Sequence, residues 1–304
     1  MPDFVSISDP VAGESATGRV RFDLRRPPIE PPIEPSLDRK PDLRTKGNSS
    51  PPLVLLGGMT QTLASWGGQI RPLSKSRPVL AYEARGQGST VLSIERADLA
   101  QHVDDLVSLV HALELPTPFD LCGFSFGARV CLSVAASRPQ LVRRLVLSGL
   151  GIDRGVVGRL IVQGWIAALG TGNLEALARI SLPDIVGPAY LEQHADLVEP
   201  MVTAVMQRNS FEGIRALFLQ TLEAPEGSPW TTAALAERVR CPTLVMGGAL
   251  DRLAPPTEVA ELARRLGGRH VTFPNAGHTI PIEAATAWRE AVLAFLDEDE
   301  PSAS

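Results

Sequence analysis

The sequence predicts an α/β fold, in which a mostly parallel central sheet is flanked by helices. From residue 53 onward, short apolar runs alternate with longer amphipathic stretches, as strands alternate with crossover helices in such sheets. In addition, a glycine-rich turn around Ser125 joins one apolar run to a helix-compatible stretch. A chain of 304 residues with 44% hydrophobic content is long enough to bury the core that this fold needs.

The first 26 residues, 1–26, are predicted to form an N-terminal edge hairpin. Phe4–Ile7 and Gly18–Leu24 alternate apolar and polar side chains, as strands with one buried face do. Residues 27–52 contain eight of the 26 prolines, which indicates a stiff and solvated connector. We therefore expect the main domain to begin after this connector.

Residues 53–297 are predicted to form the main α/β domain. Amphipathic periodicity predicts helices over Leu63–Leu73 and Leu99–Leu113, and a last helix over about Ile282–Leu296. Residues 298–304 form an acidic tail that we expect to be frayed and solvated. The predicted strands are Leu53–Leu56, Pro78–Tyr82, Phe119–Cys122, Arg144–Ser148, Thr243–Gly247 and His270–Phe273.

Residues 154–230 interrupt the alternation of strands and helices. They have the pattern of several short helices, separated by glycines and prolines, and contain no clear strand. We interpret this segment as a helical insertion, or lid, within the α/β domain.

Composition and charge exclude several classes of protein. A formal net charge of −5 does not provide the positive field that draws proteins to nucleic acid. No apolar run approaches the ~18 residues needed to span a bilayer, so we expect no integral membrane association. The acidic N-terminal segment resembles neither a signal peptide nor a transit peptide, which favours a cytoplasmic location. The sequence carries no signal for an oligomeric state.

The cysteines and histidines predict neither a disulfide framework nor a metal site, and no cofactor is expected. Cys122, Cys131 and Cys241 lie in apolar surroundings without a CxxC pair, so we expect buried, reduced thiols. Four histidines show no metal-ligand spacing and are expected at surface or core positions, namely His102, His111, His194 and His270.

The segment around Ser125 has the pattern of a nucleophile elbow. A strand ends at Cys122, a tight turn follows over Gly123-Phe124-Ser125-Phe126-Gly127, and a helix-compatible run continues to Ser137. Glycines on both sides of Ser125 fit a strained turn that leaves its neighbours no room for side chains. We therefore expect the Ser125 hydroxyl to stand above the sheet as a nucleophile.

A general base and an acid that orients it follow Ser125 in the order that this architecture requires. Asp251 comes just after the strand Thr243–Gly247, and His278 lies in the loop after the strand His270–Phe273. Considered alone, Asp251 fits a helix cap, and His278 fits an ordinary loop position. Their order after a serine elbow favours catalysis, with His278 as the base and Asp251 as the orienting acid.

Two backbone N–H groups are predicted to receive the developing oxyanion. One belongs to Phe126, directly after the nucleophile, and the other belongs to Met59 in the loop Gly57-Gly58-Met59-Thr60. A plain tight turn is the alternative explanation for the two glycines.

Together these residues resemble the α/β-hydrolase superfamily over about residues 53–297. Glu83-Ala84-Arg85-Gly86-Gln87-Gly88-Ser89 is similar to the family's acid-x-Arg-Gly-x-Gly-x-Ser loop, whereas Gly57 stands where many members carry a histidine. The chain looks most like the branch of enol-lactone hydrolases and small carboxylesterases. The resemblance implies an α/β-hydrolase fold with a helical lid insertion, and a serine hydrolase that acts on a small-molecule ester or lactone.

The lid supplies most of the specificity pocket in folds of this kind, which implies that Ile161 and Trp165 line the substrate site. Packing against the sheet is the alternative for both side chains. Five arginines of this segment are candidates for binding a substrate carboxylate, namely Arg154, Arg159, Arg179, Arg208 and Arg215.

Two other functions are compatible with the same residues. Some members of the superfamily use the triad for lyase chemistry of the menaquinone-pathway type, in which the serine abstracts a proton from an anionic substrate. The other alternative is a non-catalytic ligand-binding protein on this fold, although an intact Ser125, Asp251 and His278 argue against it.

Overall fold

The computed structural model describes residues 2–13, 15–27, 50–222, 224 and 227–298. Most of the predicted connector at 27–52 and most of the predicted acidic tail at 298–304 lie outside the described residues. The strands of the described chain are β1 (Asp3–Ser8), β2 (Thr17–Arg25), β3 (Leu53–Leu56), β4 (Val79–Tyr82), β5 (Phe119–Phe124), β6 (Val142–Ser148), β7 (Thr243–Gly248) and β8 (Arg269–Phe273).

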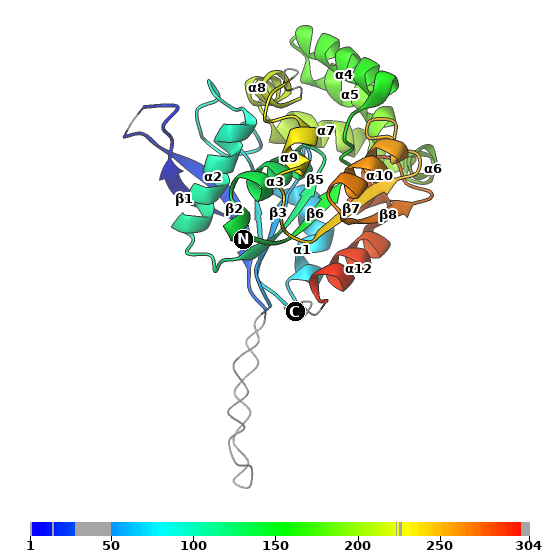
Figure 1. Ribbon diagram of the computed structural model, residues 1–304. Helices are drawn as coiled ribbons and strands as arrows, with labels where there is room; N and C mark the ends of the chain where they lie inside the picture. The colour runs from blue at the N-terminus through cyan, green and yellow to red at the C-terminus, as the bar shows by residue number, and fades with distance from the viewer. Residues whose placement is uncertain (1, 14, 28–49, 223, 225–226, 299–304) are drawn as a thin grey trace, which may run out of the picture.

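These strands form one sheet in the order β1-β2-β4-β3-β5-β6-β7-β8 (Figure 1). The strands from β4 to β8 in this order pair in parallel, and β1 and β2 form an antiparallel pair that joins the edge of β4. The predicted mostly parallel sheet flanked by helices is confirmed. Strand β5 continues past the predicted end at Cys122, as far as Phe124.

Alternate side chains of the central strands point into two separate cores. In β3, Val54 and Leu56 join the core on one face of the sheet, whereas Leu53 and Leu55 join the core on the other. Parallel strands covered on both faces bury every side chain, which explains why they appear as unbroken apolar runs. The covering helices are α2 (Leu99–Ala112), α3 (Phe126–Ser137) and α10 (Pro256–Arg265) on the first face, and α1 (Gly67–Leu73) and α12 (Ala285–Leu296) on the second (Figure 1).

A run of helices is inserted between β6 and β7, and Figure 1 shows it beyond the carboxyl ends of the parallel strands. No strand occurs in the described part of residues 154–230. The helices are α4 (Gly155–Gly170), α5 (Leu174–Ile185), α6 (Pro188–Gln193), α7 (Val198–Arg208) and α8 (Phe211–Thr221), with a 3-10 turn η3 (Ala195–Leu197), and the shorter α9 (Thr232–Ala236) follows them. We refer to α4–α8 as the inserted helices. Within the described residues, no helix is long and apolar enough to cross a membrane.

Two predicted helices are divided in the structure. The first begins as a 3-10 turn, η1 (Leu63–Trp66), whose leading N–H donates to Glu83 at 3.2 Å, before α1 continues it. The last starts earlier than predicted, as the short α11 (Ile280–Glu283), and breaks at Ala284 before α12. At the break the backbone of Ala284 leaves the helical region, with φ of −121° and ψ of 40°, and the Glu283 carboxylate just before it binds backbone N–H groups of the preceding loop.

Candidate active site

Ser125 lies in a strained turn between β5 and α3. Its φ of 54° and ψ of −114° fall in a region that side-chain-bearing residues rarely adopt. A Cβ atom on Gly123 would collide with the carbonyl oxygen of Gly127, and one on Gly127 would collide with that of Leu56. The two glycines that flank Ser125 are therefore required by the close approach of backbone segments around the turn.

The structure brings Ser125, Asp251 and His278 into direct contact. His278 Nε2 lies 2.8 Å from Ser125 Oγ, and His278 Nδ1 lies 2.7 Å from Asp251 Oδ2. The other carboxylate oxygen of Asp251 accepts the backbone N–H groups of Leu253 and Ala254, each at 2.8 Å. Because a carboxylate accepts hydrogen bonds, Nδ1 carries the imidazole proton and the Nε2 lone pair faces the serine hydroxyl. Asp251 and His278 are both buried.

Glu283 organises the loop that carries His278. One carboxylate oxygen accepts the backbone N–H groups of Gly277 and Gly187 at 2.8 and 2.9 Å, and the other accepts Thr279 N–H and Oγ1–H at 3.0 and 2.7 Å. The residues on both sides of His278 are thus held by one side chain. Sequence reasoning missed Glu283, and no sequence signal marks it, because three of the four groups that it binds are backbone N–H groups.

The predicted oxyanion loop lies against the elbow. Gly127 N–H donates to the carbonyl oxygen of Gly57 at 3.0 Å, which ties the loop after β3 to the start of α3. Met59, Ser125 and Phe126 line one common cavity. In the described chain, neither Met59 N–H nor Phe126 N–H donates a hydrogen bond to a protein acceptor. Both residues therefore line this cavity with backbone N–H groups that have no protein acceptor among the described residues.

A small apolar cavity opens beside Ser125 and His278. It has a volume of about 70 Å³, and its apolar walls include Trp165, Leu177 and Phe218 from the inserted helices. Trp165, which the sequence resemblance assigned to substrate binding, is fixed there by its Nε1–H bond to Asp184 at 3.0 Å.

Ile161, the other predicted substrate-binding residue, is not among the side chains that line the cavities around Ser125. It lies one helical turn before Trp165 and is buried in the core beneath α4, with only 9% of its surface exposed. Of the pair predicted for substrate binding, only Trp165 lines a cavity together with Ser125.

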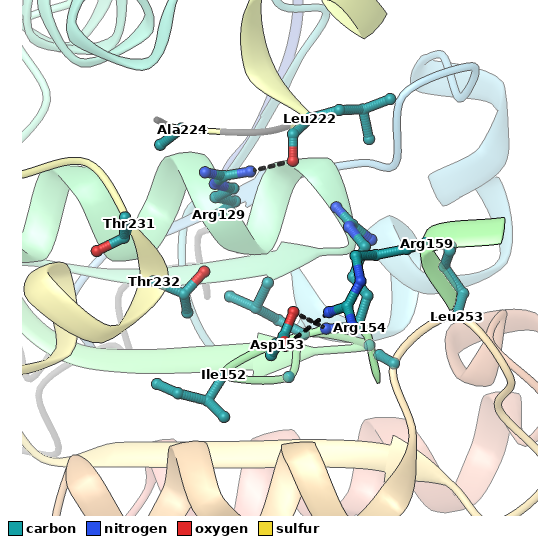
Figure 2. Close-up of a pocket in the computed structure, with 14 residues that line it drawn as sticks. Arg129, Ile152, Asp153, Arg154, Arg159, Leu222, Ala224, Thr231, Thr232 and Leu253 are labelled. Carbon is teal, nitrogen blue, oxygen red and sulfur yellow. Dashed lines mark hydrogen bonds and ion pairs between the residues drawn. The ribbon is translucent and has the colours of Figure 1, made fainter. Parts of the chain in front are cut away.

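A larger cavity of about 260 Å³ shares lining residues with the cavity formed by Met59, Ser125 and Phe126 (Figure 2). Arg129, Arg154 and Leu253 line both this cavity and the one that contains Ser125. In Figure 2, Arg159 bonds to Asp153, at 2.9 Å, and Arg129 bonds to the carbonyl oxygen of Leu222, at 2.7 Å.

The five arginines that the sequence offers for binding a substrate carboxylate differ in whether they line a cavity. Arg154 and Arg159 line the larger cavity, whereas Arg179 is half-exposed and pairs with Glu175 and Glu199 on the surface of the inserted helices. Arg208 and Arg215 line none of the cavities described above.

The remaining histidines and the cysteines stand apart from this site. His102 is fully buried on α2, with its ring edge-on to Phe126 at 5.1 Å between centroids, and burial lowers the pKa of His102 to about 4. Cys122 and Cys131 are buried free thiols, and Cys241 is half-buried. Over the described ranges, no three His, Cys, Asp or Glu side chains gather as a metal ion would require.

Comparisons with known proteins agree on the architecture. Residues 51–285 match the family model described as alpha/beta hydrolase fold. The pyrrolizixenacetamide deacetylase of Xenorhabdus hominickii is 27% identical, over 83% of this chain and 93% of its own length. A dihydrolipoyllysine-residue acetyltransferase component of the acetoin cleaving system of Pseudomonas putida is 28% identical over 82% of this chain, which spans 64% of that protein. The enol-lactonase from Burkholderia xenovorans LB400 has a similar fold, with a TM-score of 0.75 and 22% identity over 92% of this chain and 97% of that one.

Proposed function

Because the chain belongs to the alpha/beta hydrolase fold family, we propose that it is a serine hydrolase that cleaves a carboxylic ester or lactone. The observation that carries the proposal is the pair of hydrogen bonds made by His278, at 2.8 Å to Ser125 Oγ and 2.7 Å to Asp251 Oδ2. A base that touches a nucleophile and is oriented by a carboxylate is the arrangement that activates serine.

The reaction follows from these contacts. Ser125 Oγ attacks the carbonyl carbon while His278 Nε2 takes its proton, and the N–H groups of Met59 and Phe126 receive the charge that develops on the carbonyl oxygen. When the C–O bond of the tetrahedral intermediate breaks, His278 returns the proton to the leaving alcohol, which remains tethered if the substrate is a lactone. Water, deprotonated by His278, then attacks the acyl-enzyme, and Ser125 recovers its proton as the acid leaves.

The apolar cavity supports a small acyl group on the substrate. Its volume of about 70 Å³ corresponds to roughly five water-sized groups. Trp165 and Phe218 line it, with their ring centroids 6.2 Å apart in an edge-to-face arrangement. Among similar proteins, one is named a deacetylase and another an enol-lactonase, which is consistent with short or cyclic acyl groups.

The proposal is tested with p-nitrophenyl esters of increasing acyl length and with a panel of lactones. We expect the wild-type protein to prefer short acyl chains, and Ser125→Ala to lower kcat by at least about 1,000-fold because the attacking oxygen is lost. Ser181→Ala is the matched control, since Ser181 lines the same cavity and its hydroxyl donates to Ala178 rather than contacting His278. Equal rates for wild type and Ser125→Ala would exclude serine hydrolysis and favour a ligand-binding role.

A second candidate function is favoured by the arginines beside the nucleophile. Arg154 lines both the cavity that contains Ser125 and the larger cavity of Figure 2. Guanidinium groups in this position suit an anionic substrate, as a lyase of this fold would need when Ser125 abstracts a proton instead of attacking a carbonyl. Turnover of neutral p-nitrophenyl esters would favour the hydrolase, whereas Ser125-dependent turnover confined to anionic substrates, without an acyl-enzyme, would favour the lyase.

A further inference from the structure

Gln87 binds two of the four carbonyl groups of the predicted oxyanion loop. Its side-chain Nε2 donates to the carbonyl oxygens of Gly58 and Met59 at 2.8 and 3.0 Å. Its Oε1 accepts Ala84 N–H at 3.0 Å, so the amide is anchored in its own loop. The side chain is only 2% exposed. This buried amide therefore links the Arg-Gly-x-Gly segment to the loop after β3.

Two contacts with Gly58 fix the direction of the Met59 N–H group, because the Gly58 carbonyl oxygen accepts Gln87 Nε2–H at 2.8 Å and the backbone N–H of Gln61 at 3.0 Å. A trans peptide is planar, and its C=O and N–H groups point in opposite directions. The carbonyl of Gly58 points at Gln87, so the N–H of Met59, which belongs to the same peptide, points away from Gln87. Met59 lines the cavity that also contains Ser125 and Phe126. Rotation of this peptide would break the Gln87 bond and turn a carbonyl oxygen toward the position of the oxyanion.

Asn209 connects the same loop to the inserted helices. It lies between α7 and α8, where its Oδ1 accepts Gly88 N–H at 3.1 Å and its Nδ2 donates to the carbonyl oxygen of Thr60 at 3.0 Å. At the start of α8, a Cβ on Gly213 would collide with the carbonyl oxygen of Gly86. The inserted helices thus pack backbone against backbone on the Gln87 loop.

We propose that Gln87 and Asn209 are positioning residues for the oxyanion hole. Gln87 keeps the Gly58–Met59 peptide in the donor orientation, and Asn209 makes that orientation depend on the seating of the inserted helices. The inference rests on the proposed serine hydrolase function and adds to it the means by which one oxyanion donor is set. Neither side chain is required to touch the substrate.

The principal test is Gln87→Glu, a nearly isosteric change. The new carboxyl keeps an acceptor for Ala84 N–H but presents an oxygen to the two loop carbonyls. We expect kcat for a short p-nitrophenyl ester to fall about 10- to 100-fold, with KM changed by less than about threefold, because the lost orientation is used in the transition state. The affinity for a trifluoromethyl ketone, whose adduct places an oxyanion at this point, should fall by the same factor as kcat.

Gln220→Glu is the matched control. Gln220 on α8 makes the same kind of two-sided amide bridge, accepting Ala97 N–H at 2.7 Å and donating to the Ile94 carbonyl at 3.2 Å, but it does not contact the oxyanion loop. Its kcat and inhibitor affinity should match those of the wild type. Gln87→Met, which removes the donor without adding charge, should behave like Gln87→Glu, and thermal unfolding identifies any variant that fails to fold.

Asn209→Asp tests the coupling to the inserted helices. This change keeps the acceptor for Gly88 N–H and removes the donors to the carbonyl oxygens of Thr60 and Val205. We therefore expect kcat to fall roughly 2- to 10-fold, with KM preserved. The effect should be absent when Gln87 is already replaced, because both side chains act on the same loop.

The outcomes separate this inference from the proposed function. If Ser125→Ala abolishes turnover but folded Gln87→Glu and Gln87→Met keep the wild-type kcat and inhibitor affinity, the inference is wrong and the hydrolase proposal stands. If Gln220→Glu loses as much kcat as Gln87→Glu, the role of Gln87 is merely structural. A crystal structure of Gln87→Glu provides a readout that needs no activity, since we expect the Gly58–Met59 peptide to rotate. An unrotated peptide would overturn the inference.

Discussion

Two histidines lie on either side of the nucleophile turn in opposite surroundings. His278 packs against Phe124, the residue before Ser125, with ring centroids 5.1 Å apart, and both of its ring nitrogens have hydrogen-bond partners. His102 packs at the same distance against Phe126, the residue after Ser125, but its Nε2 has no hydrogen-bond partner in the described chain. One imidazole is thus bonded at both ring nitrogens, whereas burial disfavours the charged form of the other.

The burial of His102 predicts a pH-dependent stability. Burial lowers its pKa in the folded protein from 6.5 to about 4, so the unfolded state binds more protons between these values. Stability due to His102 is therefore complete above about pH 6.5 and is lost as pH falls toward 4, by on the order of 3 kcal/mol in total. We expect His102→Asn to flatten the pH dependence of the free energy of unfolding in this window, measured by urea titration at several pH values.

The control for this measurement is His111→Asn, on the exposed face of the same helix. This substitution should leave the pH dependence of the free energy of unfolding between pH 4 and 6.5 unchanged. If His102→Asn kept the pH dependence of the wild-type free energy of unfolding, carboxylates rather than His102 would cause the loss of stability in acid.

At the level of the elements, two loops near Ser125 are held by side chains that lie outside them, namely the loop Gly57-Gly58-Met59-Thr60 and the loop that carries His278. The strands were predictable because parallel strands buried on both faces leave unbroken apolar runs, and Ser125, Asp251 and His278 were predictable because their order and strand-end positions are set by the architecture. The supporting residues were not. Glu283 and Gln87 bond to backbone N–H and C=O groups, which every residue has, so no partner signature exists in the sequence.

Glu283 gives the element-scale prediction. Glu283→Gln replaces one accepting oxygen by an NH₂ group, which removes two of the four hydrogen bonds that Glu283 accepts, either those from Gly187 and Gly277 or those from Thr279. We expect the free energy of unfolding to fall by about 1–3 kcal/mol, and kcat to fall about 10-fold because His278 loses its fixed position. Urea unfolding and steady-state ester hydrolysis measure the two effects.

Glu261→Gln is the control for this change, because Glu261 lies on the exposed side of α10 and pairs only with Arg264 and Arg265 among the described residues. Its stability and kcat should equal those of the wild type. A Glu283→Gln protein with wild-type kcat would show that the His278 loop keeps its geometry through the backbone bonds of His278 and Thr279 to the Ile185 carbonyl.

At the level of the whole molecule, the N-terminal hairpin, β1 and β2, is joined to the rest of the fold by more than sheet pairing. Asp9, just after β1, accepts Arg85 Nη1 at 2.8 Å with one oxygen and Ser93 N–H at 2.6 Å with the other. Arg85 is fully buried and also forms a two-point contact with Asp105 on α2, at 2.7 and 2.8 Å. The same loop that carries Gln87 is therefore anchored from the N-terminus of the chain.

This anchor predicts that a change in the hairpin destabilises the whole fold. Asp9→Asn keeps the size of the side chain but removes one of the two carboxylates around a buried guanidinium, and we expect a loss of about 1–3 kcal/mol in the free energy of unfolding. Asp3→Asn, at an exposed position of β1, should have no measurable effect on the free energy of unfolding.

Both variants are compared by urea unfolding, followed by two probes, tryptophan fluorescence and far-UV circular dichroism. If the hairpin and the parallel sheet unfold as one unit, the two transitions coincide and shift together in Asp9→Asn. A shift in neither probe would mean that Asp105 alone compensates Arg85, and that the hairpin contributes to the fold only through its pairing with β4.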